Sequence, residues 1–478
     1  MNRAITRLFA LLVVLFGLLV AFTSRWTVFS ATALDKNPLN KLSIYASWEV
    51  KRGQILADNG QVLARSVPAR GGLWSRSYPF GSLFSQTVGY SNIQFNQAAG
   101  LESTYASQLA GTVHSNVSSV FGPLSRSTKG NDLYTTLDPK LQQLARKLLA
   151  GRVGSVVAIV PQTGAIKVMY SNPVNNPNNP FACKLVIDNV GCQENLATQG
   201  QLPPGSTFKI VTTTAALNTG KFTPQSLLRG PSPLIVSGRP LHNDGDVSYG
   251  PTSLTKALTY SINTIYAQVG QRVGPALMSE YMKRFGFYST PPLDYPAQQM
   301  MASGERLNGK LILPTSPYVD IGRMSIGQDK LTVTPLQMAM VVATVANGGT
   351  LMAPRLATKV VNPLGQVVES FPPKVYNHVM APRIAAEIGQ MMTKVVEEGT
   401  GQAANLQGLY AAGKTGTAQT GGYKNGLELD DAWFVGFPVK DPQIAVAVTL
   451  ENIQLGYGGT YAAPIAAQIM KAYLAELK

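Results

Sequence analysis

The sequence Pro203-Pro-Gly-Ser206-Thr-Phe-Lys209 decides the fold and the chemistry that this chain supports. Its two prolines and Gly205 break the preceding chain, so we expect a helix to begin at Ser206. Ser206 and Lys209 then share one face of that helix. A serine hydroxyl needs a base within hydrogen-bond reach, and a lysine can be that base when burial or nearby positive charge lowers its pKa. The spacing therefore predicts Ser206 as nucleophile and Lys209 as its base.

The Ser-x-x-Lys pattern is weak evidence on its own, because about one or two copies occur by chance in a chain of this length. A second copy, Ser253-Leu-Thr-Lys256, indeed exists. It lacks the Pro-Pro-Gly lead-in, so we interpret it as part of an ordinary surface helix. The first copy needs support from elsewhere in the chain.

Two later elements supply that support. Ser261-Ile-Asn263 is the only Ser-x-Asn in the chain, and Lys414-Thr-Gly-Thr417 contains the only Lys-Thr-Gly. A hydroxyl such as that of Ser261 can relay a proton beside a catalytic lysine, and the Asn263 amide can bind a peptide carbonyl or orient the lysine. We expect the second element on an edge strand, where Gly416 lets a substrate backbone approach. Lys414, Thr415 and Thr417 can bind a carboxylate there, and the backbone N–H groups of Ser206 and Thr417 can form an oxyanion hole.

Strand and helix patterns at the two ends of the chain predict the fold class. Asp138 and Pro139 have the pattern of a helix start, and an amphipathic helix follows over residues 140–149. Strand-like runs occupy residues 155–160, 165–170, 432–437 and 443–450, with a last helix at 464–477. Strands at both ends with helices between them predict one α/β domain over residues 135–478. Residues 27–134 have little helical periodicity and indicate a β-rich pedestal.

An apolar run near the amino terminus predicts a membrane anchor. Arg3 and Arg7 precede an uncharged stretch from Leu8 to Ser24, and Trp26 suits the outer interface. We expect residues 8–26 to span the membrane, residues 1–7 to be cytoplasmic and the rest to be exported. The alternative is a cleaved signal peptide, with Ala31-Thr-Ala33 as the cleavage site.

Composition and charge exclude several classes of protein. Hydrophobic residues make up 45% of the 478 residues and charged residues 14%, which argues against wholesale disorder. Two Cys and three His predict neither a metal site nor a cofactor. Because the chain is expected to be exported, its net charge of +15 favours anionic lipid or envelope polymers as its surroundings. No nucleic-acid-binding motif is present. Outside the cell Cys183 and Cys192 can form a disulfide, although two free buried thiols are the alternative.

The order Ser-x-x-Lys, Ser-x-Asn, Lys-Thr-Gly resembles the penicillin-recognising serine enzymes. The remainder of the chain resembles class B penicillin-binding proteins, and the short pedestal without appended carboxy-terminal modules is similar to the small actinobacterial penicillin-binding protein A type. The further segments that carry this resemblance are Arg52–Ile55, Asp58–Gly60, Leu63-Ala64, Gly100–Glu102 with Tyr105, Leu109 and Gly111, Thr135–Pro139, Val160–Gly164, Thr334–Gln337 and Ala346–Gly349.

The resemblance implies a peptidoglycan D,D-transpeptidase that cross-links stem peptides through a Ser206 acyl-enzyme. Its fold would be the antiparallel, helix-flanked sheet of serine β-lactamases and penicillin-binding proteins. Its substrates would be lipid-linked or nascent peptidoglycan, β-lactams its covalent inhibitors, and a polytopic glycan polymerase a partner. Roles in cell division and in cell shape are both compatible with the sequence.

Other activities stay open at this point. A β-lactamase, a D,D-carboxypeptidase, and a non-catalytic β-lactam sensor or structural subunit share parts of the pattern. Glu305-Arg-Leu-Asn308 is one residue short of the deacylation element of class A β-lactamases, so we treat it as coincidence. We interpret His114, His242 and His378 as structural or surface residues, and Asp430-Asp431 as a solvated turn.

Overall fold

The structure is a computed structural model. It describes residues 3–25, 49–92, 97–111, 129–183, 186–187, 190–406 and 408–477.

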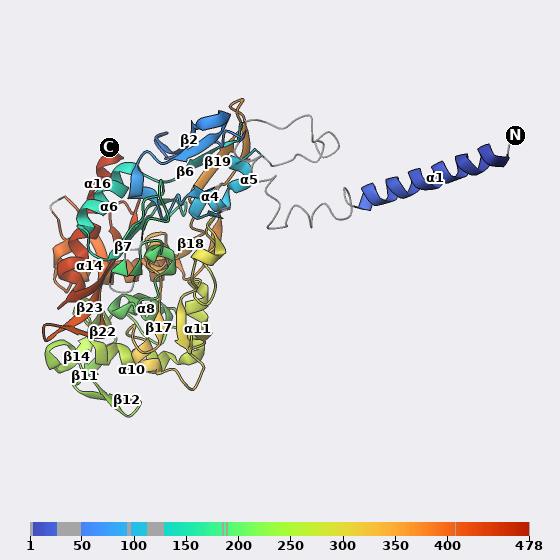
Figure 1. Cartoon of the computed structure of the whole chain (residues 1–478). Helices are drawn as coiled ribbons and strands as arrows, with labels where there is room; N and C mark the ends of the chain where they lie inside the picture. The colour runs from blue at the N-terminus through green and yellow to red at the C-terminus, as the bar shows by residue number, and fades with distance from the viewer. Residues whose placement is uncertain are drawn as a thin grey trace.

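An antiparallel five-stranded sheet forms the centre of the molecule, in the order β22-β23-β24-β7-β8. In Figure 1, β22 and β23, which come from the end of the chain, lie in the same domain as β7, which comes from its first third. This arrangement confirms the predicted α/β domain, whose sheet uses both ends of the chain. The strands are β7 (Gly154–Ile159), β8 (Ile166–Asn172), β22 (Ala411–Lys424), β23 (Leu427–Pro438) and β24 (Ala445–Gln454).

Two groups of helices cover the central sheet. The helices α6 (Pro139–Leu149) and α16 (Ala463–Glu476) pack together, and α8 (Lys209–Asn218), α13 (Pro335–Ala346) and α14 (Pro382–Glu397) form the second group. The predicted cap of α6 is confirmed, because the Asp138 carboxylate accepts hydrogen bonds from the backbone N–H groups of Lys140 and Leu141. All but the last residue of α13 is buried, so this helix lies within the core.

A second sheet joins the pedestal to the catalytic domain. Its order is β20-β19-β6-β1-β2-β3, with β1 (Ile55–Leu56), β2 (Val62–Pro68), β3 (Trp74–Ser77) and β6 (Asp132–Thr135) from the pedestal side. The other two strands, β19 (Ala357–Val361) and β20 (Val367–Ser370), come from far downstream. Figure 1 shows β19, in orange, beside β6 and β2. Backbone hydrogen bonds therefore cross the predicted boundary at residue 134.

The pedestal contains a buried ion triad. The Glu102 carboxylate lies 2.9 Å from Nη2 of Arg52 and 2.5 Å from Nε of Arg76, and Glu102 is fully buried. Glu102 is the middle residue of α4 (Gly100–Thr104), whereas Arg76 lies on β3 and Arg52 precedes β1. The triad thus links the short helix α4 to the second sheet through ion pairs.

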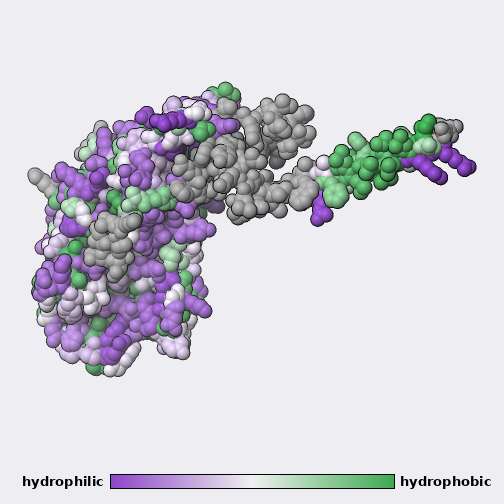
Figure 2. All heavy atoms as spheres, viewed as in Figure 1, coloured by the Kyte–Doolittle hydropathy of each residue, from purple (hydrophilic) through white to green (hydrophobic). Residues whose placement is uncertain are grey.

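The helix α1 (Arg3–Ser24) is long and apolar enough to cross a membrane. Figure 2 shows it as almost uniformly apolar, with hydrophilic residues at its two ends. It fits the predicted single-pass anchor. Trp26 and Ala31-Thr-Ala33 lie outside the described residues. Cys183 and Cys192 are joined in a disulfide, with their Cα atoms 6.5 Å apart.

Candidate active site

Ser206 lies on a single 3-10 turn, Gly205–Phe208, that leads directly into α8 at Lys209. Gly205 adopts a φ of +51°, a conformation that favours glycine. A β-carbon at this position would lie 2.6 Å from the carbonyl oxygen of Thr417. The missing side chain therefore lets the turn rest against β22, which brings half-buried Ser206 next to the predicted Thr417.

Lys209 is fully buried, and its ammonium group contacts the Ser261–Asn263 element. Its Nζ lies 2.7 Å from the carbonyl oxygen of Ser261, 3.1 Å from Ser261 Oγ and 2.8 Å from Asn263 Oδ1. Burial, and then the positive charge of Lys414, lower the pKa of Lys209 well below its usual range. A lysine in this environment can lose its proton and act as a base.

Ser261 occupies the loop between α9 (Leu254–Thr259) and α10 (Asn263–Val273), with a φ of +58°. This left-handed conformation is uncommon for a residue with a side chain. It turns the Ser261 hydroxyl between two lysines, because Lys414 Nζ also donates to Ser261 Oγ, at 3.1 Å. Burial lowers the pKa of Lys414 to about 7. Within the described residues no carboxylate forms an ion pair with either lysine.

The Lys414–Thr417 element lies on β22, which is the edge strand of the central sheet, as predicted. Thr415 Oγ1 lies 2.6 Å from the hydroxyl oxygen of Thr400, and Lys414 Nζ donates to the Thr415 carbonyl at 2.9 Å. Gly416 also lies against another part of the chain. A β-carbon there would lie 2.8 Å from the carbonyl oxygen of Pro204, so the missing side chain lets the backbone at Pro204 approach this strand.

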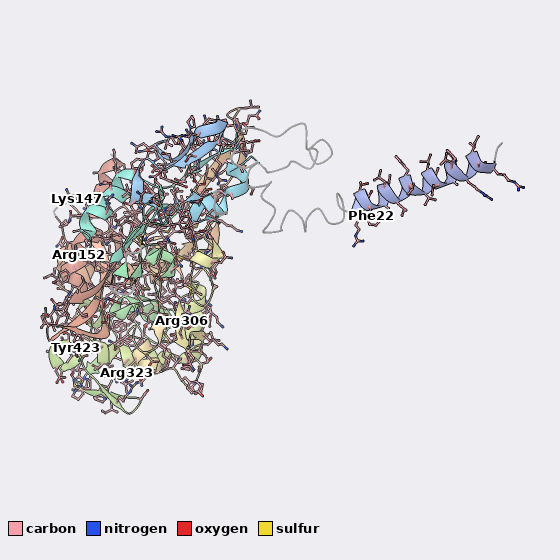
Figure 3. All side chains as sticks on the ribbon, viewed as in Figure 1. Phe22, Lys147, Arg152, Arg306, Arg323 and Tyr423 are labelled. Carbon is pink, nitrogen blue, oxygen red and sulfur yellow. A yellow bond between two sulfur atoms is a disulfide. The ribbon has the colours of Figure 1, made fainter. Side chains whose placement is uncertain are left out.

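The prediction for Asp430 and Asp431 is wrong. Both residues are buried within β23, because the β22–β23 hairpin turns earlier in the chain, at Asn425-Gly426. The Asp431 carboxylate accepts a hydrogen bond from the Asn452 backbone at 3.1 Å, and burial raises the pKa of Asp431 to about 7. Figure 3 labels Tyr423, which marks the tip of this hairpin.

The remaining sequence features lie apart from this cluster. Ser253 caps α9 by accepting the Lys256 backbone N–H, so the second Ser-x-x-Lys belongs to an ordinary helix start, as interpreted. The buried Glu305 accepts a hydrogen bond from the Tyr288 hydroxyl. His242 and His378 are exposed, and His114 lies outside the described residues.

Sequence reasoning missed two residues beside the cluster. The Thr400 hydroxyl is hydrogen-bonded to the Thr415 hydroxyl, and the ring centroid of Tyr266 lies 5.4 Å from Lys209 Nζ. The Tyr266 hydroxyl contacts Thr213 Oγ1 at 2.8 Å. Tyr266 follows Asn263 by three residues on α10, so helical spacing could have identified it. No comparable local signal marks Thr400.

Comparison with protein families agrees with this geometry. The model of the penicillin binding protein transpeptidase domain matches residues 154–471. The chain belongs to the penicillin-binding protein transpeptidase family. The model of the penicillin binding protein A dimerisation domain matches residues 52–132 of this penicillin-binding protein. The expected family is thereby confirmed.

Relatives that match over the full length, and solved structures, show which penicillin-binding proteins this chain is similar to. It is 32% identical to peptidoglycan D,D-transpeptidase PbpA of Mycolicibacterium smegmatis over 100% of both chains. It is 30% identical to PbpA of Mycobacterium tuberculosis over 99% of both chains. The ceftriaxone acyl-enzyme complex of penicillin-binding protein A from M. tuberculosis aligns with a TM-score of 0.78 and 29% identity, covering 90% of this chain and 100% of that chain.

Proposed function

We propose that this chain is a peptidoglycan D,D-transpeptidase in which Ser206 forms the acyl-enzyme. The observation that carries the proposal is the pair of buried lysines joined through Ser261 Oγ next to the Ser206 turn. Two adjacent lysines cannot both stay charged easily in a buried site without carboxylate partners. One neutral lysine and one charged lysine suit a reaction that needs both a base and a binding group for a carboxylate.

Lys209 is the proposed base in the acylation step. When neutral, its amine keeps two N–H donors and presents a lone pair that can take the Ser206 hydroxyl proton. The serine oxygen then attacks the carbonyl carbon between the two terminal D-alanines of a donor stem peptide. The backbone N–H groups of Ser206 and Thr417 would bind the resulting oxyanion, since the Gly205 turn rests against Thr417.

Collapse of this intermediate breaks the peptide bond and releases the terminal D-alanine. The leaving nitrogen needs a proton, and Ser261 can deliver the one held by Lys209 or Lys414, because its hydroxyl contacts both ammonium groups. An amine from a neighbouring stem peptide then attacks the ester on Ser206, loses a proton through the same relay and forms the cross-link.

The Lys414–Thr417 element is the proposed binding site for the terminal carboxylate of the donor. Charged Lys414 and the hydroxyls of Thr415 and Thr417 lie along the open edge of the central sheet. The Asn263 amide, whose oxygen contacts Lys209, would hold the backbone of the stem peptide. A β-lactam presents a carbonyl and a carboxylate to the same groups and would leave a slowly hydrolysed acyl group on Ser206.

We also propose an orientation for the chain, with residues 1–7 in the cytoplasm and the catalytic domain outside. Arg3 and Arg7 before the apolar helix favour this direction, and the Cys183–Cys192 disulfide suits an oxidising compartment. A polytopic glycan polymerase would then be a neighbour in the membrane. Protease treatment of intact spheroplasts should digest the catalytic domain; full protection would reverse the orientation.

Covalent labelling with penicillin tests the proposed nucleophile. Mass spectrometry should find one adduct on the wild-type chain, located at Ser206, and none on Ser206→Ala. Ser253→Ala, in the second Ser-x-x-Lys, is the matched control and should label like the wild type. Equal labelling of Ser206→Ala would overturn the assignment.

A second measurement separates the transpeptidase from the other serine enzymes. Incubation with a D-Ala-D-Ala donor peptide and an amine acceptor should give the cross-linked product in excess over the hydrolysed donor. Hydrolysis alone would indicate a carboxypeptidase, turnover of the penicillin adduct within seconds a β-lactamase, and stable labelling without either peptide product a sensor or structural subunit.

A further inference from the structure

The helix α10, which begins at Asn263, takes its cap from a distant part of the chain. Its N-cap position is Ile262, whose side chain has no group that can accept a hydrogen bond. The backbone N–H of Thr264 instead donates to the side-chain oxygen of Asn243, at 3.0 Å. Asn243 lies in the loop that follows β13 (Arg239–Leu241). This loop therefore fixes the start of the helix that carries Asn263.

The same loop also orients the Asn263 side chain. The Asn263 amide nitrogen donates to the backbone carbonyl oxygen of His242 at 3.2 Å, and the amide oxygen accepts from Lys209 Nζ at 2.8 Å. A carbonyl oxygen can only accept, so the His242 carbonyl keeps the amide nitrogen on its own side and the amide oxygen on the side of Lys209. If the amide were turned over, two oxygens would face each other and an NH₂ group would face the lysine.

Asn243 is held in this loop by hydrogen bonds from all of its polar groups. Its amide nitrogen donates to the carbonyl oxygens of Gly230 and Val247, at 3.1 and 2.9 Å. Its backbone N–H donates to Ser232 Oγ at 3.0 Å, and its backbone carbonyl accepts the Asp246 N–H at 3.0 Å. Because Asn243 is only 5% exposed, its side chain cannot turn without leaving buried polar groups unpaired.

A second contact supports the hairpin that precedes the loop. The Arg323 guanidinium group, labelled in Figure 3, donates at 2.9 to 3.3 Å to the backbone carbonyl oxygens of Val236, Arg239 and Pro240. The segment that follows Arg323 also contacts the nucleophile turn, because the Gly205 N–H donates to the Gly327 carbonyl at 3.0 Å. The loop and the Ser206 turn are therefore attached to one common segment.

The position of the Asn263 oxygen matters most when Lys209 is neutral. A neutral amine has two N–H donors and one lone pair. The Ser261 carbonyl oxygen and Asn263 Oδ1 lie 2.7 and 2.8 Å from Lys209 Nζ, closer than Ser261 Oγ at 3.1 Å. These two oxygens accept only, so they can take both N–H donors. The lone pair is then left for the proton of the Ser206 hydroxyl.

We propose that Asn243 is a positioning residue of the active site, which holds the His242 carbonyl and the start of α10 so that Asn263 keeps its oxygen on Lys209. None of the hydrogen bonds of Asn243 goes to Ser206 or Lys209, so Asn243 acts through Asn263. The inference rests on the proposed function, in which Lys209 is the base of the acylation step. The second N–H of the Asn263 amide stays available for the stem peptide.

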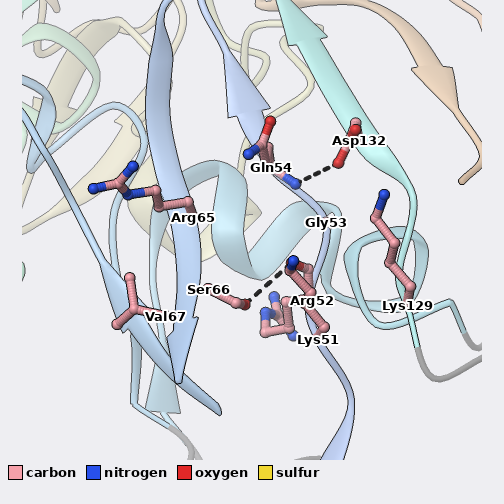
Figure 4. A pocket seen from close by; sticks show the side chains of 9 residues that line it. All are labelled: Lys51, Arg52, Gly53, Gln54, Arg65, Ser66, Val67, Lys129 and Asp132. Carbon is pink, nitrogen blue, oxygen red and sulfur yellow. Dashed lines mark hydrogen bonds between the residues drawn. The ribbon is translucent and has the colours of Figure 1, made fainter. Parts of the chain in front are cut away.

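Two buried or partly buried hydrogen bonds elsewhere provide matched controls. Asn195, which is 2% exposed, caps α7 (Leu196–Gln199) by accepting the Ala197 N–H at 3.2 Å. In the pedestal, Asp132 Oδ1 accepts the Gln54 backbone N–H at 2.6 Å, as Figure 4 shows. Asn195→Ala and Asp132→Ala should lower the melting temperature and acylate within about 2-fold of the wild type. Acylation slowed in both controls as much as in Asn243→Ala would overturn the proposal.

A double-mutant cycle in the full-length chain tests whether Asn243 acts through Asn263. Asn243→Ala should lower the first-order rate constant of acylation by penicillin at least about 10-fold, and should change the dissociation constant of the non-covalent complex less than about 2-fold. In an Asn263→Ala background the same substitution should change the rate constant less than about 3-fold, because there is no amide left to orient. Stopped-flow acylation over a range of penicillin concentrations gives both constants.

The outcomes of the cycle separate this inference from the proposed function. Wild-type acylation by Asn243→Ala, or the same fold loss in both backgrounds, would overturn the positioning role. A wild-type chain that is not acylated at Ser206 would instead refute the proposed function. If Asn243→Ala does not fold, Asn243→Asp takes its place with the same expected results. It keeps the acceptor for the Thr264 N–H but places an oxygen opposite the carbonyl oxygens of Gly230 and Val247.

Discussion

At the scale of single residues, the active site depends on the strained backbone of Ser261. Its φ of +58° directs the hydroxyl to a point where Lys209 and Lys414 both reach it at 3.1 Å. Because the oxygen accepts from both lysines, the hydroxyl hydrogen is free to point elsewhere. This arrangement lets one small side chain connect the proposed base with the proposed carboxylate-binding lysine.

Ser261→Gly tests this connection without imposing backbone strain, because glycine adopts a positive φ readily. Loss of the relay should slow acylation by penicillin about 10²-fold, while the melting temperature stays near that of the wild type. Stopped-flow acylation and thermal unfolding measure the two effects. Asn308→Gly, at an exposed position with a φ of +51°, controls for the backbone change and should acylate normally. Wild-type acylation by Ser261→Gly would exclude the relay.

The two lysines also predict the pH dependence of acylation. The rate constant should fall on acidification, as Lys209, whose pKa is lowered, regains its proton and ceases to be a base. It should fall again above pH about 7, where Lys414 loses the charge that binds the carboxylate. Second-order acylation rates from pH 5 to 9 should follow a bell-shaped curve that belongs to the coupled pair. A flat profile would show that neither lysine titrates in the free enzyme.

At the scale of elements, contact between the Ser206 turn and β22 fixes the site. Gly205 and Gly416 leave room for this contact, since β-carbons at these positions would lie 2.6 Å from Thr417 O and 2.8 Å from Pro204 O. The strand that would bind the donor peptide is thereby held against the turn that carries Ser206.

Gly416→Ala should push β22 away from the turn and lower the acylation rate at least about 10-fold, since small displacements of reacting groups are costly. Acylation kinetics and the melting temperature measure the effect. Gly422→Ala, on the same strand, places its β-carbon 3.3 Å from Oγ1 of the exposed Thr420, a side chain that can shift by a few tenths of an ångström, and should be close to neutral. If both variants acylate like the wild type, the contact does not position the site.

At the scale of the whole molecule, the second sheet makes the pedestal and the catalytic domain one structure. The strand β6 pairs with β1 on one side and with the distant β19 on the other. The Arg52–Glu102–Arg76 triad stabilises the pedestal side of this sheet. Burial alone would raise the pKa of Glu102, but the charges of Arg76 and Arg52 outweigh it and lower the pKa.

Glu102→Gln should destabilise the fold by about 3–5 kcal/mol, because it leaves two arginines without their buried counterion. The wild-type triad should contribute fully above the ordinary pKa of a glutamate and lose its contribution as the pH falls through the lowered pKa of Glu102. Urea unfolding at several pH values measures both effects. Glu280→Gln, which removes an exposed partner of Arg284, should change stability by less than about 0.5 kcal/mol. Equal stability of the two variants would contradict the role of the triad.

The sequence by itself determined the features that depend on local pattern. The helix cap at Asp138, the antiparallel strands at both ends of the chain, the apolar anchor helix and the family all follow from residue types at fixed spacing. The same patterns identified Ser206, Lys209, Ser261, Asn263 and Lys414 as candidates, because unusual residue combinations stand out against chance.

Only the tertiary structure decided which distant groups meet. The hydroxyl of Ser261 lies between two lysines, Gly416 faces the backbone of Pro204, Thr400 holds Thr415, and Asp430 and Asp431 are buried in β23. Each of these contacts joins segments that are remote in sequence, or depends on where a hairpin turns. The lowered pKa values of the two lysines arise from burial, which is a property of the packed molecule and of no local sequence.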